Sequence, residues 1–256
     1  HPKPAGEGTA VMAVAGPEAA LSLLAMVRDH MGEGISAFEL MHRMGLDFLS
    51  ETMEHVKQPF ENAPEWMVLI DIGLARGLDP ATALETLFAD AYEAGLVTDG
   101  IIAQSEAQRA ELWTVRATIP EANRRIGTIS SHDISVPLGA IPEFIGAGNA
   151  ALAKLGPFRI NCFGHVGDGN LHYNVFPPKG QGKDAYTPLR DDIKRTVHDA
   201  VHALGGSVSA EHGVGRLKVD DLERYGDPVK LSAMRAVKDA RDPNGIMNPG
   251  AVLRAR

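Results

Sequence analysis

One segment of the 256-residue chain decides the fold around it: Asn161-Cys162-Phe163-Gly164-His165-Val166-Gly167-Asp168-Gly169-Asn170-Leu171-His172-Tyr173-Asn174. An Asp-Gly pair between two runs of β-forming residues is typical of a hairpin with a two-residue turn. A type I′ turn at Asp168 and Gly169 pairs His165 with His172. Since directly opposed residues share one face of a sheet, the two imidazoles are predicted side by side, with Cβ atoms roughly 4.5–5.5 Å apart.

Two histidines on one face of a hairpin can bind one metal ion. In the same register Phe163 is paired with Asn174, so Asn174 is expected to point toward the same place. The alternative is a pair of ordinary histidines near a surface turn. The hairpin supplies no third ligand, so a decision between the two requires a residue from elsewhere in the chain.

A second segment, GGSVSAEHGVGRLK at residues 205–218, contains a candidate for that third ligand. Its pattern indicates a short strand followed by a glycine-rich loop. Glu211 would complete a His-His-Glu set with an open coordination position, which is typical of catalytic metal sites. His212 would then be free to act as a base. The alternative for both residues is a solvated loop position without a chemical role.

A third candidate is Arg116, in a helix expected to begin after Ser105. Trp113 and Arg116 lie three residues apart and therefore share one helix face. A guanidinium group binds a carboxylate well through two parallel hydrogen bonds. The alternative is a surface arginine whose aliphatic stem covers the tryptophan.

Outward from these segments the chain alternates between strand and helix patterns. Strands are expected over residues 10–15, 35–41, 66–72, 101–103, 133–137, 158–164, 171–176 and 207–209. Helices are expected from residue 17 and over 80–94, 105–119, 142–155, 186–204 and 228–242, while 42–55 is either helical or irregular. This order corresponds to two ferredoxin-like split βαβ units joined by a helical insert. We therefore expect an α+β fold: an antiparallel sheet with helices packed on one face, followed by a C-terminal helical segment.

Composition excludes several classes of protein. The net charge is 25 − 33 = −8 and hydrophobic residues make up 44% of the chain, which excludes global disorder and argues against nucleic-acid binding through basic charge. A single cysteine, Cys162, excludes an internal disulfide framework and a thiolate zinc site. The apolar stretch 10–26 is interrupted by Pro17 and Glu18, so no transmembrane segment is expected. Without a visible targeting segment, the expected location is the cytoplasm.

Taken together, the motifs resemble the C-terminal domain of the FAD-linked oxidases, the group that contains D-lactate dehydrogenase, the glycolate oxidase flavin subunit and D-2-hydroxyglutarate dehydrogenase. The motifs are GHVGDGNLH (164–172), EHGVG (211–215) and MNPG (247–250), with LWxxR (112–116) and DISVP (133–137). The resemblance extends from about Val11 to Leu253. It implies a linker over 1–9, a substrate or cap domain over 10–222, and a helical segment over 223–256 that returns to an FAD-binding domain.

The resemblance also implies a role for each site residue. Those roles are metal ligation by His165, His172 and Glu211, proton abstraction by His212, substrate contact by Arg116 and Asn174, and FAD contact by Asn248 and Gly250. The metal is a divalent ion, with zinc favoured. The implied reaction is the FAD-dependent oxidation of a small 2-hydroxy acid to a 2-oxo acid, with an unspecified electron acceptor.

The resemblance places the FAD-binding domain upstream of residue 1 in the same gene product, so this chain alone is expected to be inactive. A homodimer is compatible with the sequence. Two alternatives remain: a metal-binding module without redox activity, and a metal-dependent hydrolase that uses the His-His-Glu site and a bound water.

Two positions depart from the 2-hydroxyglutarate branch of the family. That branch has a threonine four residues after the arginine of LWxxR and a lysine two residues before the aspartate of DISVP, and both help to hold a distal carboxylate. Here these places hold Pro120 and Ser131. Either the substrate is not a dicarboxylate, or His132, Arg124 or Arg125 takes over this task.

Overall fold

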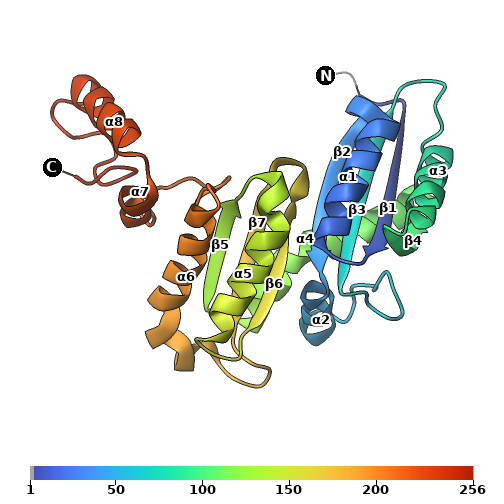
Figure 1. Cartoon of the computed structure of the whole chain (residues 1–256), viewed down its shortest axis with the longest axis horizontal. Helices are drawn as coiled ribbons and strands as arrows, with labels where there is room; N and C mark the ends of the chain where they lie inside the picture. The colour runs from blue at the N-terminus through green and yellow to red at the C-terminus, as the bar shows by residue number, and fades with distance from the viewer. Residues whose placement is uncertain (1–2, 256) are drawn as a thin grey trace.

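The computed structural model describes residues 3–255 and contains, within them, a sheet with strand order β4-β1-β3-β2-β6-β7-β5 (Figure 1). All neighbouring strands in this sheet run antiparallel. The strands are β1 (Gly6–Val14), β2 (Ile35–His42), β3 (Trp66–Leu74), β4 (Val97–Ile102), β5 (Ser130–Ser135), β6 (Arg159–His165) and β7 (Asn170–Phe176). The helices are α1 (Pro17–Met31), α2 (Arg43–Thr52), α3 (Pro80–Glu93), α4 (Glu106–Ile126), α5 (Ile141–Ala153), α6 (Arg190–Ala203), α7 (Val219–Tyr225) and α8 (Pro228–Arg241).

The sheet is built from two split βαβ units that are joined edge to edge. Strands β1–β4 have the order β4-β1-β3-β2, and β5–β7 repeat it, with a single bridge between Ser135 and Ser207 in the place of a fourth strand. The two units join through β2 and β6, which pair only where Glu39–Met41 faces Phe163–His165. The predicted α+β fold with an antiparallel sheet is confirmed.

Helices cover the sheet on both faces, whereas the sequence indicated one. Helices α1, α3, α5 and α6 pack on one face, while α2 and α4 pack on the other. The reason lies in strand β3, whose residues point alternately into the two layers: Val68 and Ile70 into the first, Met67 and Leu69 into the second. A strand that is apolar on both sides needs a helical layer on each.

A buried carboxylate on β3 fixes the start of helix α4 to the sheet. Asp71 on β3 accepts hydrogen bonds from Arg109 Nη2 at 3.0 Å and from Trp113 Nε1 at 3.2 Å. The helix begins as predicted, with the Ser105 hydroxyl accepting from the Gln108 amide. Trp113 therefore anchors the helix to the first unit. Arg116, one turn later, lies at the junction of the two units, paired with Glu39 of β2 and packed over Phe163 of β6.

The connection between β6 and β7 is longer than the predicted two-residue turn. Residues Val166–Asp168 form a 3₁₀ turn that ends at Gly169, where φ is 82°. His172 consequently lies opposite Phe163 instead of His165, and Asn174 lies opposite Asn161 instead of Phe163. The predicted register was wrong by two residues. Because side chains alternate with a period of two, this shift leaves both histidines on the same face.

Two contacts explain why the longer turn forms. Asp168 Oδ1 accepts a hydrogen bond from the Asn170 amide at 3.1 Å, and the Gly169 carbonyl accepts from the Val136 amide at 3.1 Å. The first contact lies within the turn. The second comes from Val136, the residue after β5, and is a long-range contact that the local Asp-Gly pattern does not contain.

Gly169→Ala is expected to lower the free energy of unfolding by about 2–4 kcal/mol. A Cβ at this position would lie 2.3 Å from the Val136 carbonyl oxygen, and φ is in the left-handed region. Urea denaturation measures the change. The matched control is Gly167→Ala in the same turn, where an added Cβ meets nothing within 4 Å, with an expected change below about 1 kcal/mol. Equal losses of stability in both variants would contradict the backbone conformation and close packing described for Gly169.

The two ends of the chain differ from the expected pattern. Strand β1 begins at Gly6, so residues 6–9 of the expected linker belong to the sheet, while residues 1–2 lie outside the described residues. At the other end, the unpredicted helix α7 precedes α8. Helix α8 has no buried residue, and Figure 1 shows it set apart from the sheet. No helix in the described part of the chain combines the length and apolarity needed to cross a membrane.

Candidate functional site

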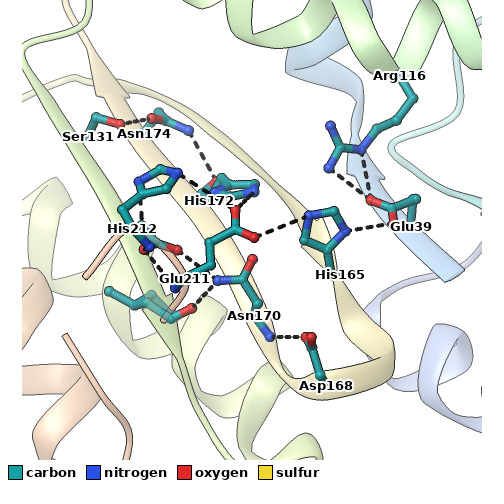
Figure 2. A network of polar contacts seen from close by, with 12 residues as sticks. Glu39, Arg116, Ser131, His165, Asp168, Asn170, His172, Asn174, Glu211 and His212 are labelled. Carbon is teal, nitrogen blue, oxygen red and sulfur yellow. Dashed lines mark hydrogen bonds and ion pairs between the residues drawn. The ribbon is translucent and has the colours of Figure 1, made fainter. Parts of the chain in front are cut away.

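A pocket of about 460 Å³ lies where β6 and β7 meet helix α4 and the loop that follows α6. It brings together the predicted metal ligands, base and substrate-binding residues: Arg116, His165, His172, Asn174, Glu211 and His212. Figure 2 shows these side chains converging from the hairpin, the helix and the loop. These six residues therefore line one pocket, although the predicted hairpin register was wrong.

Three of these residues have the geometry of a metal-ligand set. Glu211 Oε1 lies 3.3 Å from His172 Nε2, and Glu211 Oε2 lies 3.9 Å from His165 Nε2. One ligand atom from each residue lies within 4.8 Å of the others. Burial lowers the pKa of His172, assisted by the charge of Arg116, which favours the neutral imidazole that a metal ion requires. Two nitrogens and a carboxylate fit a divalent ion such as zinc.

Asp133 on β5 positions the loop that carries Glu211 and His212. Its Oδ2 accepts hydrogen bonds from both backbone amides, at 3.0 and 2.8 Å, and its Oδ1 accepts from Asn170 Nδ2 at 2.8 Å. Burial acts to raise the pKa of Asp133, but these hydrogen bonds outweigh it and hold the pKa below its ordinary value. The carboxylate thus stays charged and keeps the loop over the hairpin.

His212 has the placement of a base. Its side chain is 66% exposed, and its ring stacks on His172 with centroids 6.0 Å apart. Its Nδ1 lies 3.6 Å from Asp133 Oδ2, and its Nε2 lies 3.7 Å from Glu211 Oε1. A carboxylate next to one ring nitrogen stabilises the imidazolium that forms when the other nitrogen takes a proton.

Arg116 lies in the pocket wall, paired with a carboxylate that the sequence did not single out. Glu39 Oε2 accepts from Arg116 Nε at 2.9 Å and lies 2.8 Å from its Nη2, while Glu39 Oε1 lies 2.7 Å from His165 Nδ1 (Figure 2). The guanidinium packs over Phe163 rather than Trp113, with its Cζ 4.7 Å from the ring centroid. The signal for Glu39 was an acidic residue inside the apolar run of β2.

Asn174 is held rigidly at the pocket wall. Its Oδ1 accepts from the Ser131 hydroxyl at 2.6 Å, and its Nδ2 donates to the His172 carbonyl at 3.2 Å. Ser131 occupies the place of the lysine in the 2-hydroxyglutarate branch, and its hydroxyl orients Asn174.

Of the three residues that could replace that lysine, only Arg124 lines the pocket. Glu121 accepts from Arg124 Nε and Nη2 at 2.7 and 2.8 Å. Arg125 is turned away, toward Glu121 and the Thr52 carbonyl. His132 is buried on the other face of β5, with its Nδ1 3.2 Å from His198 Nε2, so it does not border the site as expected.

The two residues expected to contact FAD lie elsewhere. Asn248 and Gly250 follow α8, in the segment that Figure 1 shows set apart from the sheet, and neither lines the pocket. Both adopt positive φ, 47° and 74°. Asn248 borders a separate, largely apolar hollow of about 650 Å³ next to α8.

Comparison with known proteins gives a consistent result. The profile of the family described as "FAD linked oxidases, C-terminal domain" matches residues 3–252. A D-2-hydroxyglutarate dehydrogenase of Stutzerimonas stutzeri (strain A1501) is 39% identical over 201 residues, which cover 78% of this chain and 43% of the relative. The mitochondrial D-2-hydroxyglutarate dehydrogenase of Bos taurus is 33% identical over 261 residues, 98% of this chain and 45% of the relative. Since some relatives are described as mitochondrial, the expected cytoplasmic location is not confirmed.

Solved structures share the fold at low sequence identity. p-Cresol methylhydroxylase with substrate bound superposes with a TM-score of 0.65 at 12% identity, covering 99% of this chain and 54% of that one. The 4-ethylphenol oxidase of Gulosibacter chungangensis, in complex with isoeugenol, gives 0.62 at 13% identity, covering 100% and 55%. The chain spans less than half the length of the two D-2-hydroxyglutarate dehydrogenases described above.

Proposed function

Because the chain belongs to the family of FAD linked oxidases, C-terminal domain, we propose that it forms the substrate-binding part of a flavin-dependent enzyme that oxidises a 2-hydroxy acid to a 2-oxo acid. The observation that carries this proposal is the convergence of a base, a metal-ligand set and a carboxylate-binding arginine on one pocket. The two dehydrogenase relatives described above act, by their names, on a 2-hydroxy acid.

Each residue of the pocket has a role in this reaction. Arg116 binds the substrate carboxylate through Nη1, since Nε and Nη2 are engaged by Glu39. Asn174 contacts the substrate, and His212 takes the proton of the 2-hydroxyl group. A divalent metal held by His165, His172 and Glu211 would supply Lewis acidity to the hydroxyl, and flavin would accept the hydride.

The far wall of the pocket bears on the substrate class. A second carboxylate on the substrate would meet Arg124, because Pro120 and Ser131 offer no charge at that wall. Arg124 is already held by Glu121, so such a carboxylate competes with an internal ion pair. We therefore extend the proposal to small 2-hydroxy acids generally. Binding of a dicarboxylate substrate would depend on Arg124.

Since the chain spans less than half the length of the two dehydrogenase relatives, the proposal assigns the flavin to a part of the protein outside this chain. The exposed apolar residues of the C-terminal segment, among them Val229, Val237 and Ile246, support contact between this segment and that part. Asn248 and Gly250 are then placed near the flavin by the partner surface rather than by the sheet.

The test is anaerobic reduction of the full protein, with its flavin-binding part, by D-2-hydroxyglutarate, D-lactate and glycolate. We expect at least one of them to bleach the absorption of the oxidised flavin and to yield its 2-oxo acid in equal amount. If the protein binds metal but no 2-hydroxy acid bleaches a bound flavin, a metal-binding module or a metal-dependent hydrolase replaces this proposal.

A further inference from the structure

We propose that Glu39 is a positioning residue that fixes the tautomer of His165 and so prepares the metal site, while its second oxygen holds Arg116. The inference rests on the metal site of the proposed function and adds to it a residue outside the ligand set. Glu39 comes from β2, in the first unit of the fold, whereas His165 and His172 come from the second.

The position of Glu39 is determined by the sheet. Glu39 is directly paired with His165 where β2 meets β6, so the two side chains share one face. Glu39 is buried, with 4% of its surface exposed, and each of its oxygens has one partner: Oε1 has His165 Nδ1 at 2.7 Å, and Oε2 has Arg116. A carboxylate so enclosed has little freedom to rotate.

The chemistry of a carboxylate decides which nitrogen of His165 carries the proton. An ionised carboxylate only accepts hydrogen bonds, so the contact at 2.7 Å requires a proton on His165 Nδ1. In the neutral ring the lone pair then lies on Nε2, the atom that faces Glu211. His165 is thus prepared to bind a metal through Nε2, and a hydrogen bond of this kind raises the basicity of the ligand.

A purely structural role for Glu39, as counter-charge to the buried Arg116, makes different predictions. It would lower the stability of a variant without changing the tautomer of His165 or the metal affinity of the folded protein. The tautomer and the affinity therefore separate the two roles.

The substitution Glu39→Gln tests the inference in the full protein. The amide group can turn its NH₂ toward His165, which moves the imidazole proton to Nε2 and blocks the metal-binding atom. We expect zinc affinity, measured by competition with a chelator, to fall about 10- to 100-fold. The matched control is Glu33→Gln, an exposed carboxylate in the turn before β2, with an expected change below about twofold. Glu39→Asp keeps an acceptor-only group and should lose less affinity than Glu39→Gln.

A second measurement reads the tautomer of His165 in the unsubstituted protein. Nitrogen-15 NMR of labelled histidine in the metal-free protein should show His165 protonated at Nδ1, with the signal assigned by its loss in His165→Gln. Protonation at Nε2, or equal zinc affinity for Glu39→Gln and Glu33→Gln, overturns the inference. If the unsubstituted protein binds no zinc, the proposed metal site fails, and the NMR tautomer alone decides the role of Glu39.

Discussion

His212→Gln is expected to lower kcat for flavin reduction about 100- to 10,000-fold in the full protein, which is the range that one general base contributes. Glutamine keeps the size and the polarity of the side chain but cannot take the hydroxyl proton. The exposed ring of His212, with Asp133 near its Nδ1, is the base in the reaction that we propose. Stopped-flow reduction of the flavin by the best 2-hydroxy acid measures the effect.

Two comparisons make this result specific. His202→Gln replaces an exposed histidine on α6 outside the pocket and should leave kcat within about twofold of the original value. Zinc affinity in His212→Gln should change by less than about threefold, because the ligands that we propose are His165, His172 and Glu211 and not the neighbouring group of Asp133, Glu211 and His212. A His212→Gln protein that keeps more than a tenth of its kcat would assign the proton transfer to another group.

His172→Ala should lower zinc affinity by more than about 100-fold, beyond the 10- to 100-fold typical of residues that only orient a ligand. Of the two proposed histidine ligands, His172 has the nitrogen closer to Glu211, at 3.3 Å. Its loss leaves His165 and Glu211, whose ligand atoms are 3.9 Å apart, as the remaining metal ligands. Chelator competition measures the affinity, and flavin reduction should fall with zinc occupancy. His202→Gln again serves as the control.

The outcome for His172→Ala also separates metal assistance from metal-independent chemistry. Removal of zinc from the unsubstituted protein should reproduce the activity of the variant, and added zinc should restore only the unsubstituted protein. Full activity in a zinc-free protein would remove the metal from the proposed reaction and leave the two histidines with a structural role.

The site residues were largely predictable because they lie in short local patterns. His165 and His172 flank one turn, and Glu211 and His212 are neighbours in one loop. The face that the two histidines share depends only on the alternation of side chains, so it was correct even though the register was not. The register itself depends on the Val136 amide, which follows β5 and is distant from the hairpin in sequence.

The residues that were missed act through long-range pairing. Glu39 reaches His165 only because β2 and β6 become neighbours, and no pattern in either strand specifies that contact. Asp133 was visible within its motif, but its hydrogen bonds to the amides of Glu211 and His212 depend on how the loop folds back. The second helical layer was missed for the same reason, since it requires that β3 be buried on both sides.

The narrow junction between β2 and β6 has a consequence for how this chemistry can arise and change. A protein built from the first unit alone would have the carboxylate of Glu39 without an imidazole to orient, and one built from the second would have the histidines without that carboxylate. The complete site therefore exists only when the two βαβ units are joined. A substitution that changes the twist of either unit is constrained by the other, because both must meet at the same three residues of each strand.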